Sequence, residues 1–360
     1  MASPDLPSPI DWALAERVAI RVSSRSPAPT TDLPTDADLA GVVAEAEELV
    51  AAETGLRPPT PAHISVIDRP EWIRANLASF RRLLEPTFEH WIDTFAKRRP
   101  DKPAPRPGGA TARIAAIELG AMLGWVSGRV LGQYDLLVAG DTVDGQDAVY
   151  LVAPNMAMLE QKFGFDREQF RFWVALHELT HRAQFRGVPW MHDYYQGLVK
   201  EALAAANPDP GHLARSLRDA ARDPAAAKAR LDEGGALALV ATPEQRELLG
   251  RIGGLMALLE GHGDQTMDRA ASRERLPEAP RFALVLRERR KRATPVARLV
   301  QRLIGLEAKL NQYAAGARFL DAIETVEGRG AVELCWQAPQ NLPTLDEVKD
   351  PGLWLQRVAW

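Results

Sequence analysis

Apolar residues recur every three or four positions along most of this 360-residue chain, and this spacing predicts a mainly helical protein. One segment breaks the pattern: residues 148–155, AVYLVAPN, are rich in β-branched and aromatic residues and run into a proline. The preceding segment YDLLVAG, residues 134–140, can pair with it through a turn that contains Asp144 and Gly145. We therefore expect a mainly α fold with a small β-sheet.

Several helices can be placed from their patterns and end signals. The first covers IDWALAERVAIRV, and the second covers residues 36–55 and ends at Gly55. The third, starting at residue 69, is expected to break before Pro86, because proline removes a backbone donor. A helix rich in small residues is expected over residues 110–133. A later helix has Thr242 as its N-cap, Pro243 as its first residue and Gln245 to complete a capping box.

Composition and charge exclude several classes of protein. The net charge of −4 gives no basic signature, so a nucleic-acid partner is not expected. The single cysteine, Cys335, excludes an intrachain disulfide. Asp11, Glu16 and Arg17 interrupt the N-terminal segment, which is therefore not a secretory signal. No stretch of about 20 residues is free of charge, as a membrane span would be. We expect a cytoplasmic protein that does not bind membranes.

Residues 173–185, WVALHELTHRAQF, contain the pattern HExxH. His177 and His181 are four apart and share one face of a helix, so both imidazoles can bind one zinc ion. Glu178 can then take a proton from a water molecule that the metal activates. The alternative is two histidines with a purely structural place in the core or on the helix surface.

The helix around this pattern has end signals on both sides. Asp166 is placed to cap its first turn, and Gln169 completes a capping box. Gly187 can adopt the left-handed conformation that ends helices, and Pro189 prevents continuation. The two histidines share an apolar stripe with Phe170, so we expect them to face inward.

A hydrolytic zinc site takes three protein ligands and leaves one position for water. The segment LLEGHGDQTMD, residues 258–268, offers the third ligand. Glu260 lies on the apolar stripe of its helix, and Asp264, one turn later, is expected to accept the outer N–H of a histidine ligand. His262 is the alternative ligand, but it lies about 200° round the helix from Glu260.

Glycines interrupt this same helix at positions 253, 254, 261 and 263. Glycine lowers helix propensity, so four of them in one helix need a reason. We expect them to let this helix approach the HExxH helix closely. The alternative is a simple close helix crossing.

A side chain that would stabilise an oxyanion is left open by the sequence. His262, Tyr313 and Arg318 are candidates, because the helix containing LNQYAAGARF is expected to form a wall of the cleft. His192 and Tyr194, just after the motif helix, are further candidates. For Tyr313 the alternative is a packing role in a half-buried position.

These motifs resemble those of the gluzincin group of zinc metallopeptidases. Residues 177–181 spell HELTH, as in thermolysin-like members, and Glu260 with Asp264 matches their ExxxD helix. The resemblance implies a zincin-like α+β core, a bound zinc ion, Glu178 as the catalytic base and hydrolysis of an amide bond. In that group a strand before the motif helix borders the cleft, which places VYLVAPN there.

Nearly the whole chain is also similar to a bacterial family of zinc-dependent metalloproteases or hydrolases that is associated with biosynthesis of the deazaflavin coenzyme F-420. IDWALAERVA, HELTHRAQF, LLEGHGDQTMD and LPTLDEVKDPGLWLQRV carry this similarity. Glu260 follows His181 by 79 residues, farther than in thermolysin-like enzymes, which predicts helices inserted over residues 190–240. We expect an N-terminal helical region, residues 1–100, packed as one unit with a metal-binding region, residues 101–360.

The sequence therefore favours a zinc-dependent hydrolase, a metallopeptidase or amidase that acts on a peptide or a small amide. The alternative is a non-catalytic protein that keeps zinc for stability and is linked to deazaflavin coenzyme metabolism. A site closed by four protein ligands, with His262 beside Glu260, would indicate the structural role.

Overall fold

The structure is a computed structural model, and it describes residues 8–98, 108–135, 148–205, 218–228, 241–270, 275–291 and 306–358. Helices dominate these residues, and the strands among them form a small mixed sheet. The predicted mainly α fold with a small β-sheet is confirmed. In the described parts of the chain, no helix combines the length and the apolar character that crossing a membrane requires.

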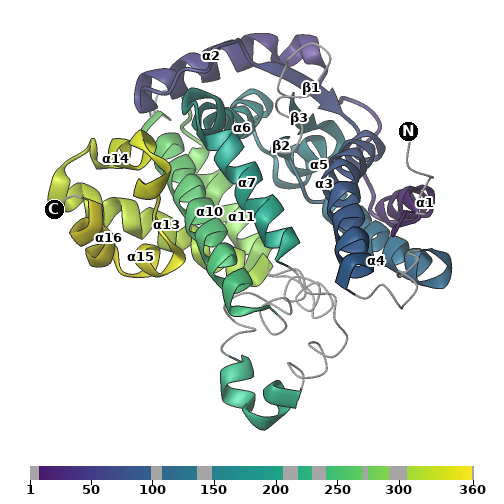
Figure 1. Ribbon diagram of the computed structural model, residues 1–360. Helices are drawn as coiled ribbons and strands as arrows, with labels where there is room; N and C mark the ends of the chain where they lie inside the picture. Colours follow the sequence, from purple (N-terminus) through teal and green to yellow (C-terminus); the bar gives the residue numbers. More distant parts are fainter. Residues whose placement is uncertain are drawn as a thin grey trace. The chain divides into compact units, whose positions relative to one another are not determined.

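The elements are shown in Figure 1. In chain order they are α1 (Trp12–Ser23), α2 (Asp36–Thr54), β1 (His63–Ile67), α3 (Arg69–Arg98), α4 (Gly109–Ser127), β2 (Gly132–Tyr134), β3 (Ala148–Val152), α5 (Ala153–Phe163), α6 (Arg167–Gly187), α7 (Met191–Ala204), α10 (Pro243–Ala270), α11 (Ala279–Lys291), α13 (Leu306–Glu327), α14 (Ala331–Gln337), a 3-10 turn (Pro339–Asn341), α15 (Leu345–Lys349) and α16 (Pro351–Val358).

The chain divides into two compact units. Unit 1 comprises Met1–Glu48 and Thr60–Leu179, and unit 2 comprises Leu49–Pro59 and Thr180–Trp360. The division passes through α2 and α6, each of which is a continuous helix. The predicted boundary between residues 100 and 101 lies outside the described residues, and it stays a prediction.

In unit 1, α1 and α4 pack against each other with their backbones in close contact (Figure 1). A Cβ on Gly120 would lie 2.5 Å from the carbonyl oxygen of Ala15, and one on Gly124 would lie 2.4 Å from that of Ala19. Only glycine fits at such distances, which explains the small residues of α4. The predicted helix over residues 110–133 is therefore present, although it ends at Ser127.

The sheet, also in unit 1, has the strand order β1-β3-β2. β3 is central: it runs parallel to β1, with His63 opposite Ala148, and antiparallel to β2, with Tyr134 opposite Val149. β3 thus has an antiparallel partner, but this partner is Gly132–Tyr134 and shares only Tyr134 with the predicted strand over residues 134–140. Residues 136–140 lie outside the described residues, so their pairing stays a prediction. The expected turn at residues 144–145 lies outside the described residues. β1 was not predicted.

A buried asparagine fixes the turn that leads into β2. Asn155, near the start of α5, donates hydrogen bonds to the carbonyl oxygens of Ser127 (2.7 Å) and Val130 (2.6 Å). Its own side-chain oxygen accepts from Arg69 Nε at 2.7 Å. Because a buried amide with all of these partners has one favoured orientation, β2 is held at a defined place beside β3.

The predicted break before Pro86 is wrong, since α3 continues through this residue. Proline removes a single backbone donor, and the rest of a 30-residue helix can bear that loss when it is packed. In the same turn the hydroxyl of Thr87 donates to the carbonyl oxygen of Leu83 at 3.1 Å. The turn around the proline therefore keeps a side-chain hydrogen bond.

The predicted N-caps of the two site helices are confirmed, whereas the return hydrogen bonds that would complete the two capping boxes stay predictions. The backbone N–H of Gln169 donates to the Asp166 carboxylate at 2.9 Å, and that of Gln245 donates to the Thr242 hydroxyl at 3.1 Å. The left-handed conformation predicted for Gly187 is wrong, because this residue does not have a positive φ. Glycine is instead required here because of a close contact. A Cβ on Gly187 would lie 2.9 Å from Leu56 Cβ.

In unit 2, α10 packs against α7, α13 and α15 (Figure 1). A Cβ on Gly261 would lie 2.4 Å from the carbonyl carbon of Gly316 in α13, and one on Gly254 would lie 2.2 Å from the carbonyl oxygen of Pro343. The predicted partner of these two glycines, the HExxH helix, is therefore wrong. They let α10 approach α13 and the segment before α15.

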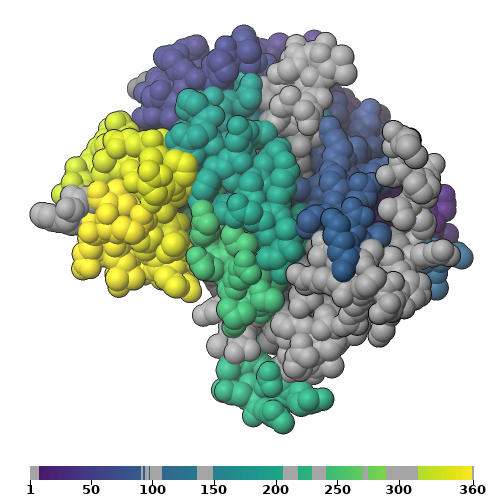
Figure 2. Space-filling model, in the orientation of Figure 1, coloured from purple at the N-terminus to yellow at the C-terminus, as the bar shows by residue number. Residues whose placement is uncertain are grey.

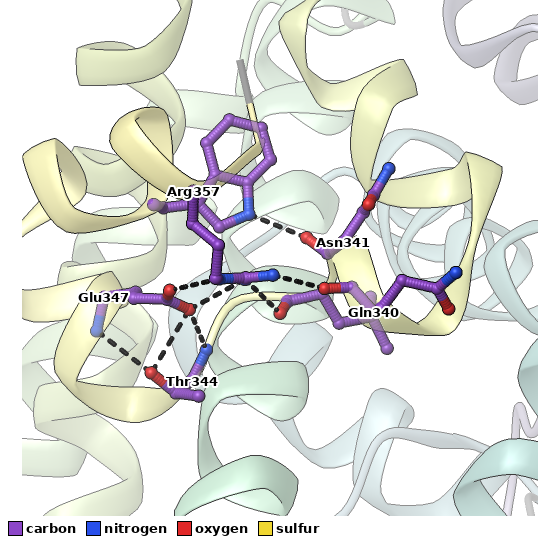
Figure 3. A network of polar contacts seen from close by, with 7 residues as sticks. Gln340, Asn341, Thr344, Glu347 and Arg357 are labelled. Atoms are coloured by element: carbon purple, nitrogen blue, oxygen red, sulfur yellow. Dashed lines mark hydrogen bonds and ion pairs between the residues drawn. The ribbon is translucent and has the colours of Figure 1, made fainter. Parts of the chain in front are cut away.

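The C-terminal helices are fixed by Arg357. Its guanidinium donates to both carboxylate oxygens of Glu347, at 2.6 and 3.0 Å, and to the carbonyl oxygens of Gln340 and Leu342 (Figure 3). Thr344 and Glu347 form a capping box at the start of α15. These helices, yellow in Figure 2, present one continuous surface.

Candidate metal centre

α6 carries the HExxH pattern as a continuous helix of 21 residues. Phe170 and Val174, which share the stripe of the two histidines, are fully or almost fully buried, and so is Leu176, about 200° round the helix from Val174. His177 and His181 are half-buried, and Glu178 is buried at 7% exposure. The two histidines, predicted to face inward, are therefore less buried than these apolar residues and than Glu178.

The structure brings together the three residues that the sequence analysis selected as metal ligands. One ligand atom from each of His177, His181 and Glu260 lies within 4.8 Å of the others. His181 Nε2 and Glu260 Oε2 are 3.8 Å apart, and their side chains keep 14% and 16% exposure. No second group of this kind occurs among the described residues.

Two imidazoles and a carboxylate are a donor set that suits zinc. Ligand atoms bonded to one tetrahedral zinc ion lie about 3.4 Å apart, since each is about 2.0–2.2 Å from the metal. The distance of 3.8 Å between His181 Nε2 and Glu260 Oε2 is close to this value. The residues present therefore fit a zinc ion with a small closing movement.

A buried glutamine determines which nitrogen of His181 is available to a metal. Gln184 Nε2 donates to the carbonyl oxygen of Leu259 at 2.9 Å, which fixes the orientation of its amide. The amide oxygen of Gln184 then lies 3.0 Å from His181 Nδ1 and can only accept. His181 Nδ1 therefore carries the proton, and Nε2, the atom that faces Glu260, keeps its lone pair.

The second N–H of the same amide is directed at His262. Gln184 Nε2 lies 2.8 Å from His262 Nδ1, so this nitrogen accepts. Burial, and then the nearby His181 and Arg269, lower the pKa of His262 to about 3, which keeps the ring neutral. Its ring also packs edge-on against Trp336, with 5.3 Å between ring centroids. His262 thus supports Gln184 and does not belong to the group of three ligand atoms.

Glu178 is held by the edge strand of the sheet. The backbone N–H of Tyr134, in β2, donates to Glu178 Oε2 at 3.1 Å. A Cβ on Gly132 would lie 2.5 Å from Glu178 Cγ, so the strand approaches this side chain closely enough to require glycine. The strand expected to border the site, VYLVAPN, is the central strand β3, and β2 makes this contact.

The family model for zincin-like metallopeptidases matches residues 10–355 of this chain. The chain belongs to the zincin-like metallopeptidase family. It is also similar to a crystal structure from Chloroflexus aurantiacus, described as that of a proposed hydrolase with a novel fold. The two share 31% sequence identity and a TM-score of 0.69, over 97% of this chain and 99% of the other. A comparison with curated proteins finds no match.

Membership of the zincin-like metallopeptidases implies a bound metal ion, typically zinc, and points to a hydrolase. The His177, His181 and Glu260 group is the place in the described residues that can hold such an ion. The predicted family is confirmed by the match over nearly the whole chain. Neither match concerns coenzyme F-420, so that association stays a prediction.

Gln184 is the residue of this zincin-like metallopeptidase that the sequence analysis missed. The expected partner for a histidine ligand was Asp264, which lies one turn after Glu260 and is exposed. At His181 the partner of Nδ1 is Gln184, and the role expected of Asp264 stays a prediction for the other histidine. The available signal was spacing: Gln184 follows His181 by three residues, and such residues are neighbours on a helix.

The residues expected to stabilise an oxyanion are placed as follows. The side chain of Tyr313 lies outside the described residues, and Arg318 is exposed on α13. On α7, the Tyr194 hydroxyl accepts from Arg251 Nη2 at 3.0 Å, and His192 Nε2 lies 3.2 Å from Gln196 Nε2. The oxyanion role of each of these residues, and that of His262, stays a prediction.

The predicted helical insertion contains α7 and helical turns within residues 218–228.

Proposed function

We propose that this chain is a zinc-dependent hydrolase that cleaves amide bonds of peptides or small amides. The observation that carries the proposal is the convergence of His177, His181 and Glu260, whose ligand atoms lie within 4.8 Å of one another. A zinc ion bound there would supply a Lewis acid for a water molecule and for the substrate carbonyl oxygen.

Glu178 is the proposed general base. It directly follows His177 on α6, and β2 holds its carboxylate through the backbone N–H of Tyr134 at 3.1 Å. A hydrogen bond of this kind favours the charged carboxylate and limits its movement, as proton transfer over a short distance requires. Glu178 would take the proton from the attacking water and pass it to the leaving nitrogen.

The geometry supports a catalytic site more than a purely structural one. A structural zinc site is closed by four protein ligands, and His262 was the expected fourth. Its Nδ1 is instead committed to Gln184 at 2.8 Å. The side chains of His181 and Glu260 also keep 14% and 16% exposure, which leaves them within reach of solvent.

The test is a comparison of metal content and hydrolysis in matched variants. The wild-type chain is expected to bind about one zinc ion and to cleave members of a peptide library or small chromogenic amides. Glu178→Gln is expected to keep zinc but to lose hydrolysis by about 10²- to 10⁴-fold, because its amide cannot act as a base. The control is Glu168→Gln, the same change at an exposed position in the first turn of α6, which should retain both properties.

Two outcomes would contradict the proposal. Absence of zinc from the purified wild-type chain, together with an unchanged unfolding midpoint in His177→Ala, would exclude the metal centre. Zinc binding without hydrolysis of any peptide or amide in either the wild type or the control would favour the non-catalytic alternative.

A further inference from the structure

The buried Gln184 amide connects the metal centre to the interior of unit 2. Its side chain is 0% exposed, and each of its polar atoms has a partner. The oxygen accepts from His181 Nδ1 at 3.0 Å, and the nitrogen reaches Leu259 O at 2.9 Å and His262 Nδ1 at 2.8 Å. Both partners of the nitrogen come from α10, the helix that carries Glu260.

Contacts with Leu259 and with His181 both favour the same orientation of this amide. If the amide were flipped, its oxygen would face the carbonyl oxygen of Leu259, and two acceptors would meet without a proton. The same flip would turn its N–H groups toward His181, so the amide could no longer accept from Nδ1 of that ring. The carbonyl of Leu259 and Nδ1 of His262 therefore act together, through Gln184, on the tautomer of His181.

We propose that Gln184 is the positioning residue of His181, and that it sets the affinity of this site for zinc by holding the His181 proton on Nδ1. The proposal rests on the metal centre proposed above and adds a residue that does not contact the metal. In this role His262 is an anchor for Gln184, which accounts for a buried histidine two residues from Glu260.

Different substitutions at position 184 should have different effects on zinc affinity and on stability. Gln184→Leu removes the amide oxygen that lies 3.0 Å from His181 Nδ1, so position 184 no longer favours this tautomer, and zinc affinity should fall by about 10- to 100-fold. Gln184→Glu keeps an acceptor for His181 but loses both donors to α10. The metal-free form of that variant should unfold at a lower temperature, while its zinc affinity should stay close to that of the wild type.

A matched control separates positioning from general damage to the core. Gln245, in α10, is a buried glutamine like Gln184. Its Nε2 donates to the backbone carbonyl oxygen of Ala202 at 3.3 Å. It precedes Glu260 by 15 residues, which is about 22 Å along a helix. Gln245→Leu should lower the unfolding midpoint without changing zinc affinity.

The experiment measures zinc affinity by competition with a chromophoric chelator, at one pH, for the full-length wild type and for Gln184→Leu, Gln184→Glu and Gln245→Leu. A loss confined to Gln184→Leu supports the proposal. Equal affinity of Gln184→Leu and the wild type overturns it, and so does an equal loss in Gln184→Glu. A wild-type chain that binds no zinc would overturn the proposed function as well. If the wild type binds zinc, a negative result with the variants overturns only the role of Gln184.

A fourth variant keeps the proposal testable if Gln184→Leu does not fold. His262→Phe preserves the ring that packs on Trp336 but removes the acceptor for one N–H of Gln184. Since Leu259 still orients the amide, the loss of zinc affinity should be smaller than for His177→Ala. A loss as large as that of His177→Ala would make His262 a metal ligand and would contradict the role of anchor.

Discussion

Tyr134 donates its backbone N–H to Glu178 Oε2 at 3.1 Å, so the edge strand of the sheet holds the glutamate of the HExxH pattern. The contact depends on Gly132, two residues earlier, which lies directly against the same side chain. A Cβ there would be 2.5 Å from Glu178 Cγ and 2.8 Å from Oε1. The glutamate is therefore placed by a strand as well as by its own helix.

Gly132→Ala should consequently reduce hydrolysis more than it reduces zinc binding. Glu178 Cγ is close to the backbone of α6 and cannot rotate away freely, so the added methyl group would displace the carboxylate. The measurement is kcat together with zinc content. Gly41→Ala in α2 is the control, because a Cβ there meets nothing within 4 Å. Unchanged kcat in Gly132→Ala would show that the position of Glu178 does not depend on this strand.

Arg171 and Glu160 give a second prediction, for the stability of unit 1. Arg171, in α6, donates to both carboxylate oxygens of Glu160 in α5, at 2.8 and 3.0 Å, and the Glu160 side chain is only 2% exposed. Arg171→Leu would leave the buried carboxylate with a more distant cation, Arg167 Nε at 3.9 Å from Oε2, at a cost of up to about 3–5 kcal/mol in the free energy of unfolding.

Urea denaturation checks this value, with Arg81→Leu as the matched control. Arg81 pairs with Glu85 at 2.9 Å, but these side chains are 59% and 32% exposed. Loss of an exposed pair of this kind should cost less than about 1 kcal/mol. Similar values for Arg81→Leu and Arg171→Leu would show that burial does not strengthen the Glu160 pair.

Much of the site could be predicted because it is encoded locally. The HExxH spacing places His177 and His181 on one face of a helix, and the apolar stripe of α10 selects Glu260 over His262. The role of Gln184 could not be predicted, because an amide three residues after a histidine is ordinary on a helix. Its meaning depends on the carbonyl oxygen of Leu259 and the ring of His262, which only the tertiary structure brings to it.

In the fold, too, the features that depend on neighbouring residues were predictable, and those that depend on tertiary contacts were not. Caps such as Asp166 and Thr242 depend on neighbours three residues away, and the sequence analysis found both. The partner of a glycine cannot be derived in that way. Gly254 and Gly261 were correctly selected as contact points, but they face the segment before α15 and helix α13. Pro86 was misjudged because packing of α3 outweighs the loss of one backbone hydrogen bond.

Gly316 gives the third prediction, for the crossing of α10 and α13. A Cβ on Gly316 would lie 1.8 Å from the carbonyl oxygen of Ala257, so Gly316→Ala must push α10 away from α13. Such overpacking costs about 1–3 kcal/mol or more in the free energy of unfolding. Because Glu260 lies one turn after Ala257, zinc affinity should fall as well.

Thermal unfolding and zinc competition check both parts, and Gly250→Ala is the control on the same helix. A Cβ at Gly250 meets nothing within 4 Å, so alanine there should stabilise α10 by about 0.5–1 kcal/mol. A Gly316→Ala variant as stable as Gly250→Ala would contradict the close crossing.

Glu347 and Arg357 give the last prediction, a dependence of stability on pH. Burial alone would raise the pKa of the Glu347 carboxyl, but hydrogen bonds from Arg357 and the Thr344 backbone outweigh it and hold that pKa below its ordinary value of 4.5. The contribution to stability is therefore present above pH 4.5 and is lost as pH falls through the lowered pKa. Arg357→Gln should lower the free energy of unfolding near neutral pH, and this difference from the wild type should shrink in acid.

Urea denaturation of the metal-free protein across this pH range measures the difference in the free energy of unfolding. Lys349→Gln, which removes an exposed pair with Asp346 at 3.5 Å, should change stability little at any pH. A difference for Arg357→Gln that is constant with pH would exclude the Glu347 carboxylate as its source.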